Sequence, residues 1–476
     1  MSHKTQRIVW AAAIIAAVVG FYVYSHWKPG GNLFFRIRAN SSEFKDINYA
    51  RFMGAETLRK ARSEELVAEV NEVIKQNGLP ADVFFDDGKQ IHNIAITLHD
   101  LFHHYYDSKN PDDALEKLWN VSPTEEWNID EQTLASVRTT FSQMEPKRRI
   151  IRTELQQRET YFYYIFVYPE SFGMWDDAGV TINTDASQYL SDYALLEEYA
   201  IAQALLDGNI NEAIDALKYI FRMTYLASHL GNVGTRSDAA LVRLRTFDVM
   251  QRVILDPNFS RTNMVELRKM LEEQYENWVP EHVTWFGDRA SGIVLYHRLA
   301  LYLPVDVLED TEYNELKNRR LVKEIKPGEF EPGIFDKGFS KYHEADEAFY
   351  LRSMQKILDV SKKPFIKRLN VLRQIDEERL SKESTVDEKD ISTEPFVANI
   401  LLKDVNRLMQ IFAKDESALK RALVLTQRSL GQSNTDQYRD PFTDEPYTIR
   451  KVDYLLSITS PELLRPFRVP VFTSRE

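Results

Sequence analysis

The spacing of apolar residues constrains the fold of this 476-residue chain more than any other feature. Apolar side chains recur mostly every three or four positions, which is the period of one face of an α-helix. Glycine is scarce, with 17 residues, and proline is modest, with 18, so few positions interrupt the pattern. Residues 89–106 follow the helical rule without a miss. The sequence therefore predicts a mainly α-helical protein.

Successive helical segments separated by short turns predict antiparallel helical hairpins. We expect helices at about residues 187–206, 212–230, 238–255, 263–275, 288–302, 344–360 and 364–380, and a final pair over 395–430 that divides near Lys414. The first of these ends at Asp207-Gly208, a good C-terminal signal, and Asn209 or Asn211 is expected to cap the next.

The junction of that hairpin, residues 202–217, resembles a tetratricopeptide-type turn, in which small residues allow two helices to approach closely. Residues 110–118 are a weaker copy. The two segments are not related by the roughly 34-residue step of a true repeat array. Two interpretations stay open, a TPR-like stack and an irregular α bundle of ordinary hairpins.

Two segments interrupt the helical pattern. Residues 168–187 contain a strand-like alternation at Val180 and Ile182, and residues 323–340 indicate an irregular connection. The charged residues 381–393 are expected to form a linker or an exposed helix end. We divide the chain into a tail and anchor (1–29), a helical region (30–160), a central helical domain (161–384) and a C-terminal helical pair with a hairpin (385–476).

The apolar run at residues 8–24 predicts a transmembrane helix. At 1.5 Å per residue it is about 25 Å long, which is near the lower limit for crossing a bilayer. It begins at Ile8; Trp10 near one end and Tyr24 at the other suit the interfacial aromatic belt. The residues after Gly20 are too bulky for a signal-peptide cleavage site, which favours an uncleaved anchor.

The direction of this anchor is less strongly encoded than its existence. Lys4 and Arg7 precede the run, whereas Lys28, Arg36 and Arg38 follow it, so the positive-inside rule hardly discriminates. We expect the short N-terminal tail to stay inside and the bulk of the chain to be extracytoplasmic, at the cell membrane.

Composition excludes several classes of function. The net charge is −12, which argues against a nucleic-acid binder, because such proteins carry a basic stripe. Zero cysteines exclude disulfides and thiolate metal sites. Phosphate-binding glycine loops and the G-x-S-x-G nucleophile motif are also absent from the sequence.

The sharpest candidate for chemistry is His99 with His103. Two histidines at i and i+4 on a helix can hold one zinc ion, as in H-E-x-x-H enzymes, although Asp100 stands where the general base would be. Both histidines lie on the flank of the apolar stripe, where a solvated or interfacial histidine row is the better explanation. The sequence identifies no third ligand, so we predict no cofactor. The alternative prediction is a zinc ion held by His99 and His103.

Two further clusters have both a structural and a functional interpretation. Glu281, His282, Asp288 and Arg289 would provide acid–base groups, but a turn between helices, with Asp288 near a helix start, explains them better. The aromatic residues 161–175 suit a ligand groove or a partner interface, but a core with a tyrosine-rich rim explains them better.

Residues 287–290 and 440–449 resemble two motifs of an uncharacterised family of bacterial single-pass membrane proteins. The family carries an N-terminal anchor, a helical region, a G-E-R-A element and a closing motif D-P-F-S/T-G-K-P-L-x-Y. Here Asp288 replaces the glutamate, and Asp444 and Glu445 replace Gly-Lys. The resemblance implies location and fold but no activity. The closing segment also predicts a β-hairpin of residues 447–449 with 454–458 that caps the helical body.

These observations favour a membrane-anchored, extracytoplasmic helical protein that acts as a scaffold for a protein partner, without catalysis. The first alternative is a membrane-tethered metal-dependent hydrolase that uses His99 and His103. The second is a small-ligand binder that uses residues 161–175.

Overall fold

The computed structural model describes part of the chain. The described residues are 92–102, 113–121, 130–157, 160–161, 186–228, 233–301, 323–326, 329–331, 334–383, 396–432, 435, 437–458 and 467–472. The predicted anchor at residues 8–24 and the strand-like alternation near Val180 lie outside them. Within the described part, no helix combines the length and the apolar character that crossing a membrane requires.

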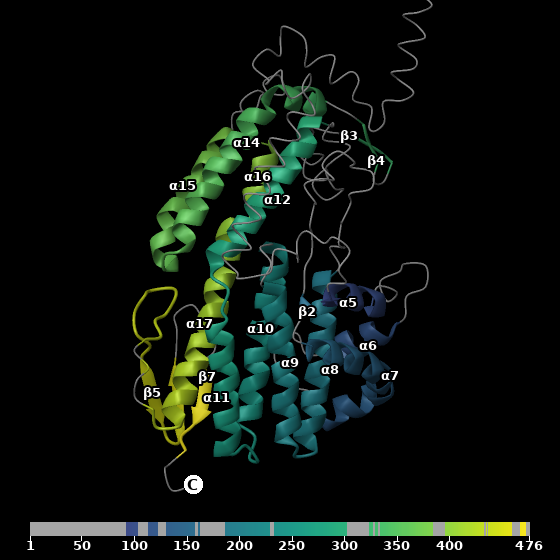
Figure 1. Ribbon diagram of the computed structural model, residues 1–476, viewed down its shortest axis with the longest axis vertical. Helices are drawn as coiled ribbons and strands as arrows, with labels where there is room; N and C mark the ends of the chain where they lie inside the picture. Colours follow the sequence, from purple (N-terminus) through teal and green to yellow (C-terminus); the bar gives the residue numbers. More distant parts are fainter. Residues whose placement is uncertain are drawn as a thin grey trace, which may run out of the picture.

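Most of the described chain is helical, as predicted, and six long helices form two layers (Figure 1). One layer holds α7 (Glu131–Leu155), α9 (Ile210–Ser228) and α11 (Arg261–Glu276), which contact one another in that order. The other holds α8 (Ala186–Leu206), α10 (Val233–Ile254) and α17 (Val405–Ser429), also in contact in order. The short helices α5 (Ile94–Phe102) and α6 (Asp113–Val121) pack against α7 and α8.

Four helices that lie between α11 and α17 in the sequence form a second group, drawn above the layers in Figure 1. They are α12 (Glu281–Leu301), α14 (Ile334–Ser361), α15 (Phe365–Glu383) and α16 (Phe396–Leu402). α14 contacts the other three. Its buried Asp346 accepts hydrogen bonds from the backbone N–H groups of Val397 and Ala398, at 3.0 and 2.9 Å. It thereby caps the first turn of α16.

α17 belongs to both groups. Its first half carries Met409 and Phe412 into the core of the second group, where Phe412 lies edge-on to Trp285. Its second half carries Leu419 and Leu423 into the core of the two layers. The helix therefore holds the two cores at a fixed separation along its axis.

The hairpin between α8 and α9 follows the sequence expectation. Gly208 takes a left-handed conformation with φ of 69°, which glycine adopts without steric cost. The Asn209 side chain accepts a hydrogen bond from the N–H of Glu212 at 3.3 Å, so Asn209 provides the predicted cap.

The predicted C-terminal hairpin is confirmed and gains a third strand. β5 (Ile449–Val452) pairs antiparallel with β6 (Leu455–Ile458), which pairs antiparallel with β7 (Phe467–Pro470). β7 packs against α10 and α17, so this sheet covers one side of the layers as expected. The connection between β6 and β7 is longer than a usual hairpin loop. The sequence therefore did not indicate β7 as a third strand.

Four boundary predictions were wrong. The final helical pair divides after Leu402 and not near Lys414, because Lys414 lies inside α17. α12 begins directly after Pro280, so Asp288 is two turns inside that helix, where buried Val283 and Trp285 hold it against the core. Within residues 323–340, the expected irregular connection contains an antiparallel pair, β3 (Lys323–Lys326) with β4 (Glu329–Glu331), and the start of α14. The helix expected over residues 89–106 begins at Ile94, because β1 (His92–Asn93) pairs parallel with β2 (Thr160–Tyr161).

The closing segment at residues 440–446 caps α15. The carbonyls of Pro441 and Phe442 accept hydrogen bonds from the N–H groups of Phe365 and Ile366, at 2.8 and 3.0 Å. The first N–H groups of a helix otherwise lack partners. Asp444, which stands at the glycine position of the resembled motif, has φ of 66°. The turn therefore keeps the left-handed residue that a glycine would supply.

This geometry predicts the response of position 444 to substitution. Asp444→Gly should change the free energy of unfolding by less than about 0.5 kcal/mol, because relief of the left-handed conformation offsets the added backbone freedom. Asp444→Val should lower it by about 1–2 kcal/mol, because a β-branched residue is strained there. Urea denaturation of the two variants measures the difference, and equal stabilities would contradict the assigned turn.

Candidate functional site

Two arginines of α10 lie in the interior of the protein. Arg236 and Arg243 are 1% and 2% exposed, and seven residues place them on the same face of the helix. Both guanidinium groups lie over the ring of Trp278, at 5.8 and 5.1 Å from its centroid. Cations at this distance from an indole face are attracted by its π electrons. We call Arg236, Arg243 and Trp278 the arginine cluster.

Arg243 is fully paired. Its Nε lies 3.0 Å from Asp415 Oδ1 and its Nη2 lies 2.5 Å from Asp415 Oδ2, which is a bidentate ion pair between α10 and α17. Its Nη1 donates to the carbonyl of Thr224 and to Ser228 Oγ, both at 2.8 Å. Asp415 is completely buried. The pair thus links α9, α10 and α17 through charge-assisted hydrogen bonds.

Arg236 is bonded differently, because its direct partners are all neutral. Nη2 donates to the carbonyl of Val279 at 2.8 Å, and Nη1 donates to Thr284 Oγ1 at 2.8 Å and to the carbonyl of Pro280 at 3.4 Å. Burial, reinforced by the charge of Arg243, lowers the pKa of Arg236 to about 10. The group is therefore still a cation at neutral pH, held at the turn between α11 and α12.

The cluster that the sequence singled out around Glu281 is dispersed by helix formation. Glu281 pairs with Arg368 of α15 and accepts from Trp285 Nε1 at 2.9 Å. Arg289 donates to Gln355 on α14 at 3.1 Å. The His282 ring lies edge-on to Phe286 of its own helix. These contacts join helices, and they do not bring Glu281 and Arg289 to a common reacting centre.

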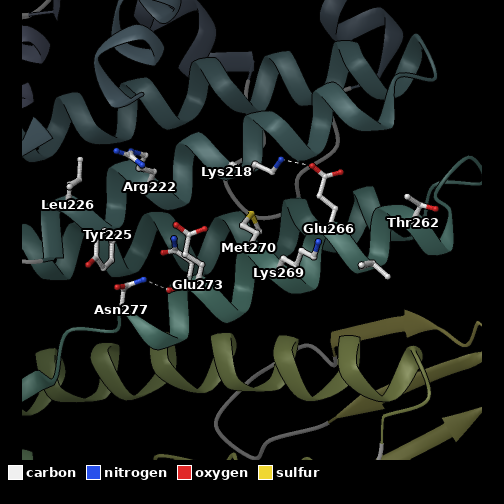
Figure 2. A pocket seen from close by; sticks show the side chains of 12 residues that line it. Lys218, Arg222, Tyr225, Leu226, Thr262, Glu266, Lys269, Met270, Glu273 and Asn277 are labelled. Carbon is white, nitrogen blue, oxygen red and sulfur yellow. Dashed lines mark hydrogen bonds and ion pairs between the residues drawn. The ribbon is translucent and has the colours of Figure 1, made fainter. Parts of the chain in front are cut away.

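A groove of about 730 Å³ runs between α9 and α11 (Figure 2). Its lining combines apolar Leu226, Val265 and Met270 with charged side chains of both signs. The cations are Lys218, Arg222 and Lys269, and the carboxylates are Glu266 and Glu273. Lys218 Nζ lies 2.5 Å from Glu266 Oε1 and joins the two helices across the groove.

The groove adjoins the arginine cluster. A much smaller cavity, of about 10 Å³, is lined by Arg236, Arg243 and Trp278, and it shares Tyr225 and Gln274 with the groove. The helices of one layer therefore carry an open, mixed-charge surface directly beside a buried cationic site. A groove with apolar and charged side chains suits the binding of a ligand through apolar contacts and electrostatic attraction.

The other predicted site residues lie mostly beyond the described residues. His99 is within α5, but nothing is described of its side chain, and His103 follows the last described residue of that helix. Of the aromatic segment 161–175, only Tyr161 is described. Among the described residues, no group of three histidine or acidic side chains is placed to hold a metal ion. The zinc and aromatic-groove hypotheses stay predictions.

The sequence did not point to the arginine cluster. A signal was present, because Arg236 and Arg243 fall in the same stripe as buried Ala240, Phe247 and Met250 of α10. A charged residue within an apolar stripe is rarely buried without a partner. The partner, Asp415, is 172 residues away from Arg243 in the sequence, and no local pattern connects the two.

The bidentate geometry predicts strong coupling between Arg243 and Asp415. Arg243→Met and Asp415→Leu should each lower the free energy of unfolding by about 3–5 kcal/mol, because each leaves a buried charge unpaired. The double variant should lose clearly less than the sum of the two. Denaturant unfolding of all four proteins completes the cycle, and additive losses would contradict a direct buried pair.

Asp288 predicts a dependence of stability on pH. Asp288 keeps some exposed surface, but burial of its carboxyl raises its pKa from 3.8 to about 7. The folded state thus binds this proton more tightly than the unfolded chain does. The Asp288 contribution should be full below about pH 4 and should decline as pH rises to about 7. The free energy of unfolding of the wild type, minus that of Asp288→Asn, should fall as pH rises from about 4 to about 7. A difference that stays constant with pH would contradict the raised pKa of Asp288.

Comparison with protein-family models, with curated proteins and with solved structures finds no significant match to this chain. The resemblance of residues 287–290 and 440–449 to a family of bacterial single-pass membrane proteins therefore stays a prediction.

Proposed function

We propose that this chain is a membrane-anchored interaction protein that holds a segment of a protein partner in the α9–α11 groove. Residues 8–24 provide the anchor in this proposal, and the helical body is extracytoplasmic. The proposal gives the two helical layers the role of a rigid scaffold, on which the groove is the binding surface.

The observation that carries the proposal is the composition of the groove. Peptide-binding grooves between helices combine an apolar surface, which supplies affinity, with charged groups that select the register of the bound segment. Leu226, Val265 and Met270 supply the first component, and the charged side chains around them supply the second. Stacking of α7, α9 and α11 in one layer also supports a TPR-like role for these hairpins.

The charges of the groove suggest the chemistry of the bound segment. Of its three cations, Lys218 is paired with Glu266 across the groove, and Arg222 donates to the carbonyl of Gln157. Lys269 makes no ion pair with any described residue. Since cations outnumber carboxylates in the lining, we expect the segment to place an acidic side chain near Lys269, between apolar ones.

A volume of about 730 Å³ is also within the range of small-molecule sites, so a small ligand is the second candidate occupant. The two candidates differ in size and in the product of cross-linking. A photo-reactive group in the groove would attach to a protein segment and produce a species of higher mass. A small ligand would produce no such species and would instead block the reaction.

Cross-linking in native membranes tests the proposal. A photo-reactive residue at Val265, inside the groove, should give a discrete adduct with one protein. Lys269→Glu should lower the adduct yield about tenfold, which corresponds to about 1.4 kcal/mol of binding free energy. The membrane fraction should retain the wild-type protein after alkaline washing, as an integral anchor requires.

Two matched controls are available on the same chain. The photo-reactive residue at Leu255, which is 41% exposed and does not line the groove, should give no adduct. Lys362→Glu, an exposed charge reversal outside the groove, should leave the Val265 adduct unchanged. Equal adducts at Val265 and Leu255, or an adduct insensitive to Lys269→Glu, would contradict the proposal.

A further inference from the structure

The outer side of α15 displays apolar side chains that the core does not use. The inner face of this helix buries Phe365, Leu372 and Ile375. On the opposite face, Ile366 and Leu369 are 56% and 36% exposed, and their spacing of three residues makes them neighbours on the helix surface. Single exposed apolar residues are normal on proteins, so this pair acquires a meaning only from the charges around it.

The charges that neighbour this pair in the sequence are all positive. Residues 360–375 contain no aspartate or glutamate, in a chain that has 72 acidic residues and a net charge of −12. Exposed Lys363 lies three residues before Ile366, and exposed Arg373 lies four residues after Leu369. Spacings of three and four residues place these side chains along one side of a helix. We call Lys363, Ile366, Leu369 and Arg373 the basic strip.

The protein does not neutralise the cations of the basic strip. Neither Lys363 nor Arg373 makes an ion pair with a residue that the structure describes. Lys367, by contrast, has Asp444 of the closing segment 3.9 Å from its Nζ. Exposed Lys362 adds a further positive charge beside Lys363. The strip therefore combines an apolar centre with an uncompensated positive potential.

The other exposed aliphatic side chains of the described helices have different surroundings. These residues are Ile150, Leu206, Leu241 and Leu255, and each has an acidic residue within four positions in the sequence. Carboxylates beside an apolar residue oppose its contact with a negatively charged surface. The basic strip lacks them and has the composition of helices that lie on anionic membranes, with aliphatic side chains among lysine and arginine.

The position of α15 leaves the strip accessible to a flat surface. α15 packs on α14 and α17, and it lies at the outer edge of the second helical group (Figure 1). A convex helix face suits a plane better than an extended peptide, which is usually held in a groove or at a sheet edge. Residues 25–91 separate the predicted anchor from the first described strand, so the chain is long enough to bring α15 to the bilayer.

We propose that the basic strip is a docking surface for the anionic phospholipid headgroups of the membrane that holds the chain. The two cations contact the headgroup phosphates, while Ile366 and Leu369 enter the boundary between headgroups and acyl chains. The contact sets the orientation of the helical body, whereas the predicted anchor provides its attachment. Lys362→Glu alone is therefore still a control for the α9–α11 groove, and the strip does not rest on the assignment of that groove.

Fluorescence quenching by lipid tests this contact. Because the chain has no cysteine, a single introduced cysteine carries a fluorophore at one known position. We expect a label on Ile366→Cys of the full-length protein to be quenched by nitroxide lipids in phosphatidylcholine vesicles that contain phosphatidylglycerol, but not in phosphatidylcholine alone. Added salt should reduce the quenching, because it screens the charges. A label on Leu206→Cys, which replaces a 49% exposed side chain outside the strip, should not be quenched in either vesicle.

Charge variants measure the share of the two cations. Each lysine or arginine near an anionic membrane strengthens the contact about fivefold, so Lys363→Gln/Arg373→Gln should lower its equilibrium constant about 25-fold. Quenching of the Ile366→Cys label at increasing phosphatidylglycerol content gives this constant. The matched control is Arg252→Gln/Arg261→Gln, which makes the same change in net charge at exposed positions and should leave the constant unchanged.

Three results would overturn the proposal. The first is equal quenching of the labels at positions 366 and 206, and the second is quenching at position 366 that does not require phosphatidylglycerol. The third is a label at position 366 that stays unquenched in anionic vesicles but has blue-shifted emission in native membranes, which would assign the strip to a protein partner. Failure of the anchor is distinguishable, because the protein would then not float with neutral vesicles, whereas the strip would still bind anionic ones.

Discussion

The ion pair between Arg243 and Asp415 is the interaction on which the rest of the structure depends. It joins α10 to α17 across 172 residues of sequence, within a core where both side chains are almost completely buried. An unpaired buried charge in that position would strongly destabilise the folded state. Separation of α10 from α17 would therefore leave Arg243 and Asp415 either exposed to solvent or buried without a partner. Because α17 enters both hydrophobic cores, this one contact also fixes the second helical group against the two layers.

α10 combines this structural role with the arrangement of the candidate sites. Its buried face positions Arg243 against Asp415, and two turns earlier it positions Arg236 at the turn between α11 and α12. The same turn follows Asn277, which lines the end of the α9–α11 groove. The shape of the groove therefore depends on how α10 holds the ends of the neighbouring helices. A change at the arginine cluster is expected to reach the groove through this packed contact.

Much of the fold could be predicted from the sequence, because turns and helix ends depend on residues that are adjacent in the chain. The hairpin at Gly208 needed only a left-handed residue and an adjacent cap, and both were visible in the sequence. The C-terminal hairpin was also visible, although its first strand is Ile449–Val452 and not residues 447–449. The division of the last helices was not, because Lys414, which is partly buried, interrupts the apolar pattern of α17 without ending the helix, whereas Asp404 precedes its observed start.

The candidate site could not be predicted because it is assembled from distant segments. Arg243 and Asp415 are paired by tertiary packing, and the groove depends on the spacing of α9 and α11, which no short motif specifies. The aspartate at position 444 shows the opposite case. It replaces the glycine of the resembled motif, yet its φ of 66° keeps the turn that glycine would adopt.

Native-state hydrogen exchange of the full-length protein tests the central role of the α10–α17 contact most directly. If the buried ion pair joins the two helices into one cooperative unit, the core amides of α10 and those of the second half of α17 should exchange with the same free energy of opening. They should also respond equally to added denaturant. Exchange of α17 at a lower free energy, together with α12, α14, α15 and α16 and before α10, would contradict this account.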